Sequence, residues 1–123
     1  MTSEHWKEEP EEQDYPAARS YLSLLVHPSE AKKTARALAD ESGVARYKAK
    51  DLLRAAGLPL LGLDDPEVAK DLAKVRAGRK LSPVLLVRGE PLWVADGYHR
   101  ICASYHLDED AEIPCRIVAR QRS

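Results

Sequence analysis

One five-residue run, Asp96-Gly97-Tyr98-His99-Arg100, has the residue types and order of an anion-binding turn. An apolar strand pattern ends just before it, and a helical pattern begins at once. The first amides of a helix lack internal partners and lie at the positive end of the helix dipole. Gly97 lets a ligand approach the backbone, and Arg100 can hold a phosphate through two parallel hydrogen bonds. The run is therefore predicted to bind an anion, foremost the phosphate of a nucleotide.

The individual roles within this run stay open at the level of sequence. Asp96 could bind Mg²⁺, take a proton from a hydroxyl group, or cap the following helix. Tyr98 could stack on a ligand ring or pack against the protein. Asp-Gly is also a common turn, and His99 with Arg100 could be an exposed, solvated pair.

The surrounding pattern predicts the elements that position this run. Three helices are expected over residues 16–26, 29–41 and 44–56. They are followed by a strand at 58–63, a helix at 66–77, a strand at 84–87, its hairpin partner at 92–95, a helix at 98–107 and a strand at 113–117. This order mixes hairpin and crossover connections, which predicts an α+β fold: a small mixed sheet with packed helices, preceded by a helical subdomain. The expected parts are a tail at 1–14, the helical subdomain at 15–57 and the sheet domain at 58–120.

Charge is distributed unevenly along the 123 residues. Residues 1–14 carry a net charge of −5 and the whole chain −1, so the remainder is near +4. Such a body tolerates anionic ligands without requiring nucleic acid. The acidic segment has few apolar residues and is expected to be disordered, solvated or folded back over a basic patch.

Composition also bears on the compartment and on metals. Two cysteines, Cys102 and Cys115, make no disulfide framework, and no apolar run approaches the length of a membrane span. A cytoplasmic protein without membrane association is expected. His99, Cys102, His106 and Cys115 could together hold zinc, but their spacing matches no standard finger, so no metal site is predicted.

Several motifs in order resemble the ParB/sulfiredoxin fold, from about Leu58 to Val118. They are the strand Ser82–Val87, the turn Gly97-Tyr98-His99-Arg100, the small residue Ala103 in the next helix, and Ile113-Pro114 opening the last strand. In that family the glycine-led turn holds nucleotide phosphates: sulfiredoxins use ATP, ParB-type partition proteins bind CTP, and a free-serine kinase branch carries a related Asp-Gly-led turn. The resemblance implies phosphate contacts from His99 and Arg100, with Gly97 and Tyr98 completing the turn.

Departures from the family narrow the expected chemistry. Sulfiredoxins carry their reactive cysteine where this chain has Tyr98, so sulfinic acid repair is excluded. The kinase branch keeps an aspartate at the position of Asp96 and needs a second carboxylate, for which Asp64, Asp65 and Glu67 are candidates. The resemblance thus favours a nucleotide-binding domain using ATP or CTP with Mg²⁺, as a small-molecule phosphotransferase.

The alternative is a nonenzymatic DNA-binding, partition or regulatory module. The helices expected at 29–41 and 44–56, joined by a turn containing Gly43, resemble a helix-turn-helix. Its second helix would present four basic residues to DNA phosphates: Arg46, Lys48, Lys50 and Arg54. These charges do not all share one helical face, and two amphipathic helices packed on the sheet would explain them equally well. The sequence makes no prediction of oligomeric state.

Overall fold

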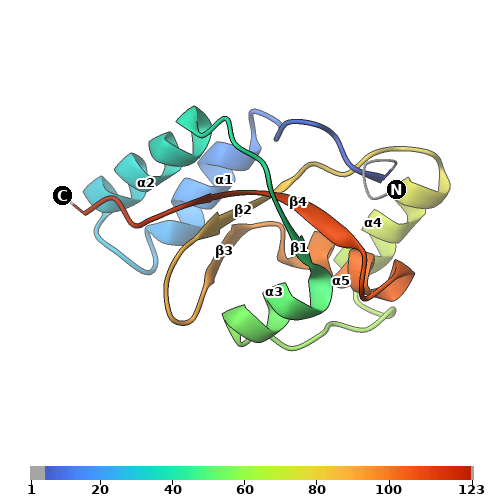
Figure 1. Ribbon diagram of the computed structural model, residues 1–123. Coiled ribbons are helices and arrows are strands. Elements are labelled where there is room, and N and C mark those ends of the chain that lie inside the picture. The colour runs from blue at the N-terminus through green and yellow to red at the C-terminus, as the bar shows by residue number, and fades with distance from the viewer. Residues whose placement is uncertain (1–4, 123) are drawn as a thin grey trace.

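A four-stranded mixed sheet with helices on both faces forms the protein (Figure 1), as the computed structural model describes it for residues 5–122. In chain order the elements are α1 (Asp14–Leu22), α2 (Pro28–Asp40), β1 (Ala45–Lys48), α3 (Ala49–Ala56), α4 (Pro66–Arg76), β2 (Val84–Val87), β3 (Trp93–Asp96), α5 (Tyr98–Leu107) and β4 (Glu112–Val118). The strand order is β1-β4-β2-β3, and only the β4–β2 pair is parallel. The α+β fold class is confirmed.

Strand β2 explains how the layers are arranged, because all four of its side chains are fully buried. Val84 and Leu86 face a core shared with α3, α4 and α5, whereas Leu85 and Val87 face a core shared with α1 and α2. Successive side chains of a strand point to opposite faces. A continuous apolar strand is therefore what a sheet covered on both sides requires.

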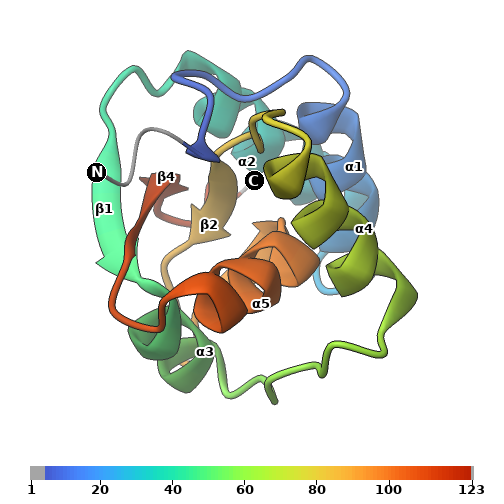
Figure 2. The same ribbon diagram turned by 90° about the vertical axis from the view of Figure 1, so that its right-hand side faces the viewer.

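Helices α4 and α5 lie side by side on one face and form the frame of the candidate site (Figure 2). Asp65 starts α4 by accepting hydrogen bonds from the amides of Glu67 and Val68, and Pro66 occupies the first turn. The helix ends at Arg76, and Gly78 follows in the left-handed conformation. The hairpin β2–β3 then leads directly into α5.

Two predicted elements are wrong. The segment expected to be one helix from 44 to 56 begins as strand β1, which pairs antiparallel with β4, so residues 15–57 supply an edge strand as well as helices. Pairing with the free edge of β4 stabilises a strand at these residues more than their local helix propensity stabilises a helix. Residues 58–63 form no strand: Pro59 has no amide to donate, and the loop is held instead by hydrogen bonds from Tyr98 and His106 to its carbonyl oxygens.

The N-terminal segment is also ordered where disorder was expected. Trp6 is only 4% exposed and pairs with Leu81, whose amide and carbonyl bond to His5 and Lys7. Asp14, expected in the tail, is buried at the start of α1. The free energy gained by burying the indole of Trp6 offsets the repulsion among the acidic residues of this segment. The tail prediction is wrong for residues 5–14, and residues 1–4 lie outside the described chain. No helix within residues 5–122 could span a membrane.

Candidate anion-binding site

Gly97 makes the turn between β3 and α5 in a conformation that other residues rarely adopt. Its φ is +114°, and a Cβ added there would lie 2.0 Å from Cγ1 of Val84 and 2.9 Å from Nη2 of Arg100. The glycine is therefore required for the close approach to β2, whether or not a ligand is bound.

The start of α5 leaves backbone donors open. The first hydrogen bond of the helix runs from the amide of Ile101 to the carbonyl of Gly97, and no side chain caps this end. Within residues 5–122 the amides of Tyr98, His99 and Arg100 have no acceptor. Three open amides at the positive end of a ten-residue helix are suited to an anion.

Two of these three residues, His99 and Arg100, line a polar pocket of about 200 Å³ between the start of α5 and α4. One side is formed by the turn residues Asp96, Gly97, His99 and Arg100. The other side is formed by α4, which contributes Glu67, Lys70, Asp71 and Lys74. Three carboxylates therefore face three permanent cations, and the imidazole of His99 adds a further donor.

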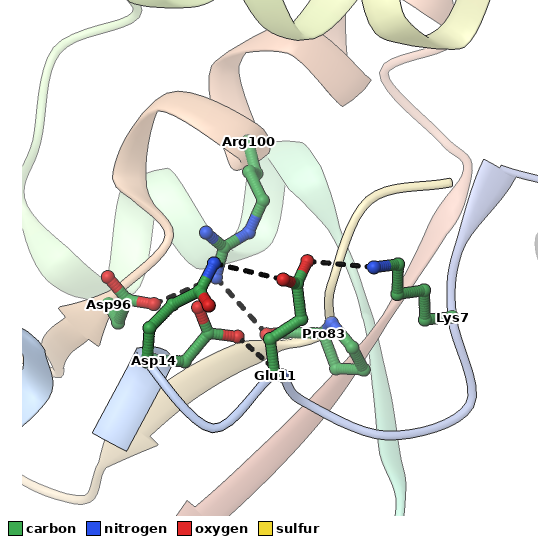
Figure 3. Close-up of polar contacts among 7 residues, drawn as sticks. Lys7, Glu11, Asp14, Pro83, Asp96 and Arg100 are labelled. Carbon is green, nitrogen blue, oxygen red and sulfur yellow. Dashed lines mark hydrogen bonds and ion pairs between the residues drawn. The ribbon is translucent and has the colours of Figure 1, made fainter. Parts of the chain in front are cut away.

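Arg100 folds back toward the turn but is partly engaged with the protein (Figure 3). Its Nη2 donates to the carbonyl of Pro83 at 3.2 Å and to Oδ2 of Asp96 at 3.1 Å. Its Nε is buried and has no partner within residues 5–122. The guanidinium thus lies beside the helix start as predicted, with one of its nitrogens committed to holding β2, β3 and α5 together.

Two carboxyl groups of the site have raised pKa values. Burial raises the pKa of Asp96, Arg100 opposes that rise, and the neighbouring Asp14 adds to it. Burial likewise raises the pKa of Asp71, against the opposing charges of Arg100 and Lys74. A carboxylate with a raised pKa is a better proton acceptor. Asp71 has no hydrogen bond or ion pair within residues 5–122, so its carboxylate is the freer of the two.

The structure separates the three candidates for a second carboxylate. Asp65 is occupied as the cap of α4, and the exposed Asp64 does not line the pocket; only Glu67 does. Asp71 was missed by the sequence analysis. Its spacing of four residues from Glu67 places both on one helix face, and this was the available signal.

Tyr98 does not line the pocket. Its hydroxyl donates to the carbonyl of Pro59, and its ring packs at the margin of the core formed with α3, α4 and α5. Of the two roles left open for this residue, the structure places it in the packing role.

The predicted helix-turn-helix is wrong, because β1 separates α2 from α3. Lys48 and Lys50 both lie close to Asp110, at 3.8 and 2.6 Å, and Arg54 lies 3.3 Å from Asp51. The four basic residues named for DNA contact, Arg46, Lys48, Lys50 and Arg54, are thus divided between β1 and α3.

The cysteines are buried in the core. Burial raises the pKa of Cys115 to about 12 and also raises that of Cys102, so neither thiol is a ready thiolate. The imidazole of His106 bonds to the carbonyl of Leu61. No group of three or more metal-ligating side chains occurs in the described part of the chain.

Comparisons of the chain with protein-family models, curated proteins and solved structures give no match. The resemblance to the ParB/sulfiredoxin fold stays a prediction.

Proposed function

We propose that this protein binds the phosphates of a nucleotide, ATP or CTP, together with Mg²⁺, and transfers a phosphoryl group to a small molecule. The observation that carries the proposal is the set of open amides at the start of α5, because two of the residues that carry them, His99 and Arg100, line the same pocket as the lysines of α4. Free amides, a helix dipole and ammonium groups at one point stabilise phosphate oxygens.

The balance of charge in the pocket favours a metal-bound nucleotide over free phosphate. Three carboxylates, Glu67, Asp71 and Asp96, offset the cations of the site. Mg²⁺ prefers such oxygen ligands and is commonly bound by one or two carboxylates plus the phosphates of a substrate. Glu67, the pocket carboxylate to which we assign no other role, would hold Mg²⁺ delivered with a nucleotide, and the ion would neutralise charge on the transferred group.

The side chains divide the work as follows. Lys70, Lys74 and His99 bind phosphate oxygens alongside the amides. Asp71, with its raised pKa and free carboxylate, accepts the proton of the acceptor hydroxyl. Asp96, the catalytic candidate of the sequence analysis, for which Mg²⁺ binding, proton transfer and helix capping were left open, instead orients Arg100 through the 3.1 Å ion pair.

A thermal-shift series with ATP, ADP, CTP and GTP, each with and without Mg²⁺, tests binding. A nucleotide at ten times its Kd stabilises the folded state by about 1.4 kcal/mol, which raises Tm by roughly 3–7 °C for a domain of this size. We expect Lys74→Gln to reduce the shift. The matched control Lys33→Gln, on the exposed side of α2, leaves it unchanged.

Transfer is tested separately from binding. Asp71→Asn should keep the Mg²⁺-dependent thermal shift and lose turnover of the nucleotide. No shift with any of the four nucleotides, or an equal shift in Lys74→Gln and the parent protein, contradicts the proposal. Binding that persists with no turnover in any variant would leave a nucleotide-binding module without phosphotransferase activity.

A further inference from the structure

A second polar cavity lies away from the turn before α5 and has no residue in common with the first. Its volume is about 720 Å³. Its walls include Trp6 and Glu9 of the N-terminal segment, Arg46 of β1, Arg116 of β4, and Lys80 from the segment between α4 and β2. Neither Arg46 nor Lys80 forms an ion pair within residues 5–122. The cavity therefore contains two cations, Arg46 and Lys80, that have no ion-pair partner in the described chain, beside the acidic residues Glu8 and Glu9.

Arg116 lines this cavity and is an unusual residue for its position, because it is a buried charge on a strand. It lies on β4, on the face opposite Cys115 and Ile117, and its side chain is only 5% exposed. Nη1 donates to the carbonyls of Ser42 and Gly43 at 2.8 and 2.9 Å. These bonds fix the guanidinium in place, but neutral carbonyls do not supply a counter-charge.

The other edge of the guanidinium is unsatisfied. Nε is buried without a partner in the described chain, and Nη2 has only the carboxylate of Glu9 at 3.9 Å, too far for a hydrogen bond. Nε and Nη2 form the edge through which arginine binds a carboxylate or phosphate with two parallel bonds. A buried charge left in this state is costly unless an anion completes it.

Glu9 is a weak occupant of this position. Its side chain is 83% exposed, and exposed ion pairs contribute little. It comes from the segment anchored by Trp6, so it reaches the cavity without being fixed there. The carboxylate thus shows which chemistry the cavity accepts while remaining easy to displace.

We propose that Arg116, assisted by Arg46 and Lys80, forms a second binding site, for an oxyanion group that displaces Glu9. The ligand chemistry is a carboxylate or phosphate presenting two oxygens to Nε and Nη2. This site is independent of the nucleotide pocket, because the two sets of lining residues are disjoint.

The test follows the Nε–H signal of Arg116 by ¹H–¹⁵N NMR in the full chain. Inorganic phosphate and succinate are titrated in parallel, with chloride at matched ionic strength as the control. We expect a saturable shift with at least one of the two oxyanions and none with chloride; which one saturates identifies phosphate or carboxylate as the ligand.

Variants make the result specific. Glu9→Gln removes the competing carboxylate and should tighten binding about two- to fivefold. Glu12→Gln, an exposed acidic residue of the same segment, should leave the Kd unchanged, and Arg46→Gln should weaken binding. Lys74→Gln, which changes a residue of the nucleotide pocket that does not line this cavity, should not change the Kd. A non-saturating shift shared with chloride, or equal effects of Glu9→Gln and Glu12→Gln, overturns the proposal.

Discussion

Substituting Gly97 by alanine tests whether the turn before α5 is held by a steric requirement of the backbone. The φ of +114° is one that alanine rarely adopts, and the new methyl group would lie 2.0 Å from Cγ1 of Val84. Val84 is fully buried in β2 and cannot move outward without disturbing the core. The substitution should therefore destabilise the fold through two separable effects.

The magnitude follows from adding these effects. A non-glycine residue at positive φ costs about 1–2 kcal/mol, and forcing an extra methyl group into a packed core costs about 1–3 kcal/mol. Gly97→Ala should thus lower the free energy of unfolding by about 2–5 kcal/mol. Gly78 provides a matched control: its φ is +79°, but a Cβ there meets no atom within 4 Å. Gly78→Ala should cost only the conformational part, about 1–2 kcal/mol.

Urea denaturation followed by circular dichroism measures both variants under the same conditions. Combining Gly97→Ala with Val84→Ala removes the clashing methyl group, so the double variant should cost at least about 1 kcal/mol less than the sum of the single variants. The reasoning fails if Gly97→Ala costs no more than Gly78→Ala, or if the double variant is strictly additive.

Two further predictions concern Trp6 and Asp71. Trp6→Ala should lower the free energy of unfolding by about 3–5 kcal/mol, as removal of a buried aromatic side chain does. It should also speed hydrogen exchange at the amide of Leu81, which bonds to the same segment, and unchanged exchange would contradict this. Burial raises the pKa of Asp71 above its ordinary value of 3.8. The protonated Asp71 therefore contributes to the free energy of unfolding below pH 3.8, and this contribution is lost as the pH rises through the higher pKa of the folded state. Asp71→Asn should therefore be more stable than the parent protein near pH 7, with the advantage disappearing below the ordinary carboxyl pKa, as urea titrations at both pH values would show.

The elements nearest the candidate site could be predicted because their signals are local. Asp65, Pro66 and Gly78 mark the two ends of α4 through capping and backbone conformation. The helix at 98–107 has the predicted bounds, since Gly97 ends the strand and the apolar pattern continues from there. Each of these features depends on residues within one turn of the chain, where sequence patterns carry most information.

The errors arise where distant segments decide the structure. The strand β1 forms because β4, more than sixty residues later, offers an open edge. The segment around Trp6 is ordered because Leu81 lies beside it. Helix propensity at β1 and acidic composition around Trp6 describe only the local chain, and tertiary contacts outweigh both.

Arg100 shows why the residue with the strongest sequence signal is a poor probe of the site it marks. Its Nη2 joins Asp96 to the carbonyl of Pro83, so it connects β3, the segment before β2 and α5 at one atom. Removing it would leave Asp96 with its raised pKa and no counter-charge, and loss of ligand binding could then follow from a shifted turn. Lys74 lines the same pocket without such bonds, so its substitution isolates the contribution of charge to phosphate binding. The pocket is therefore best tested from α4, while the turn before α5 is best tested through stability.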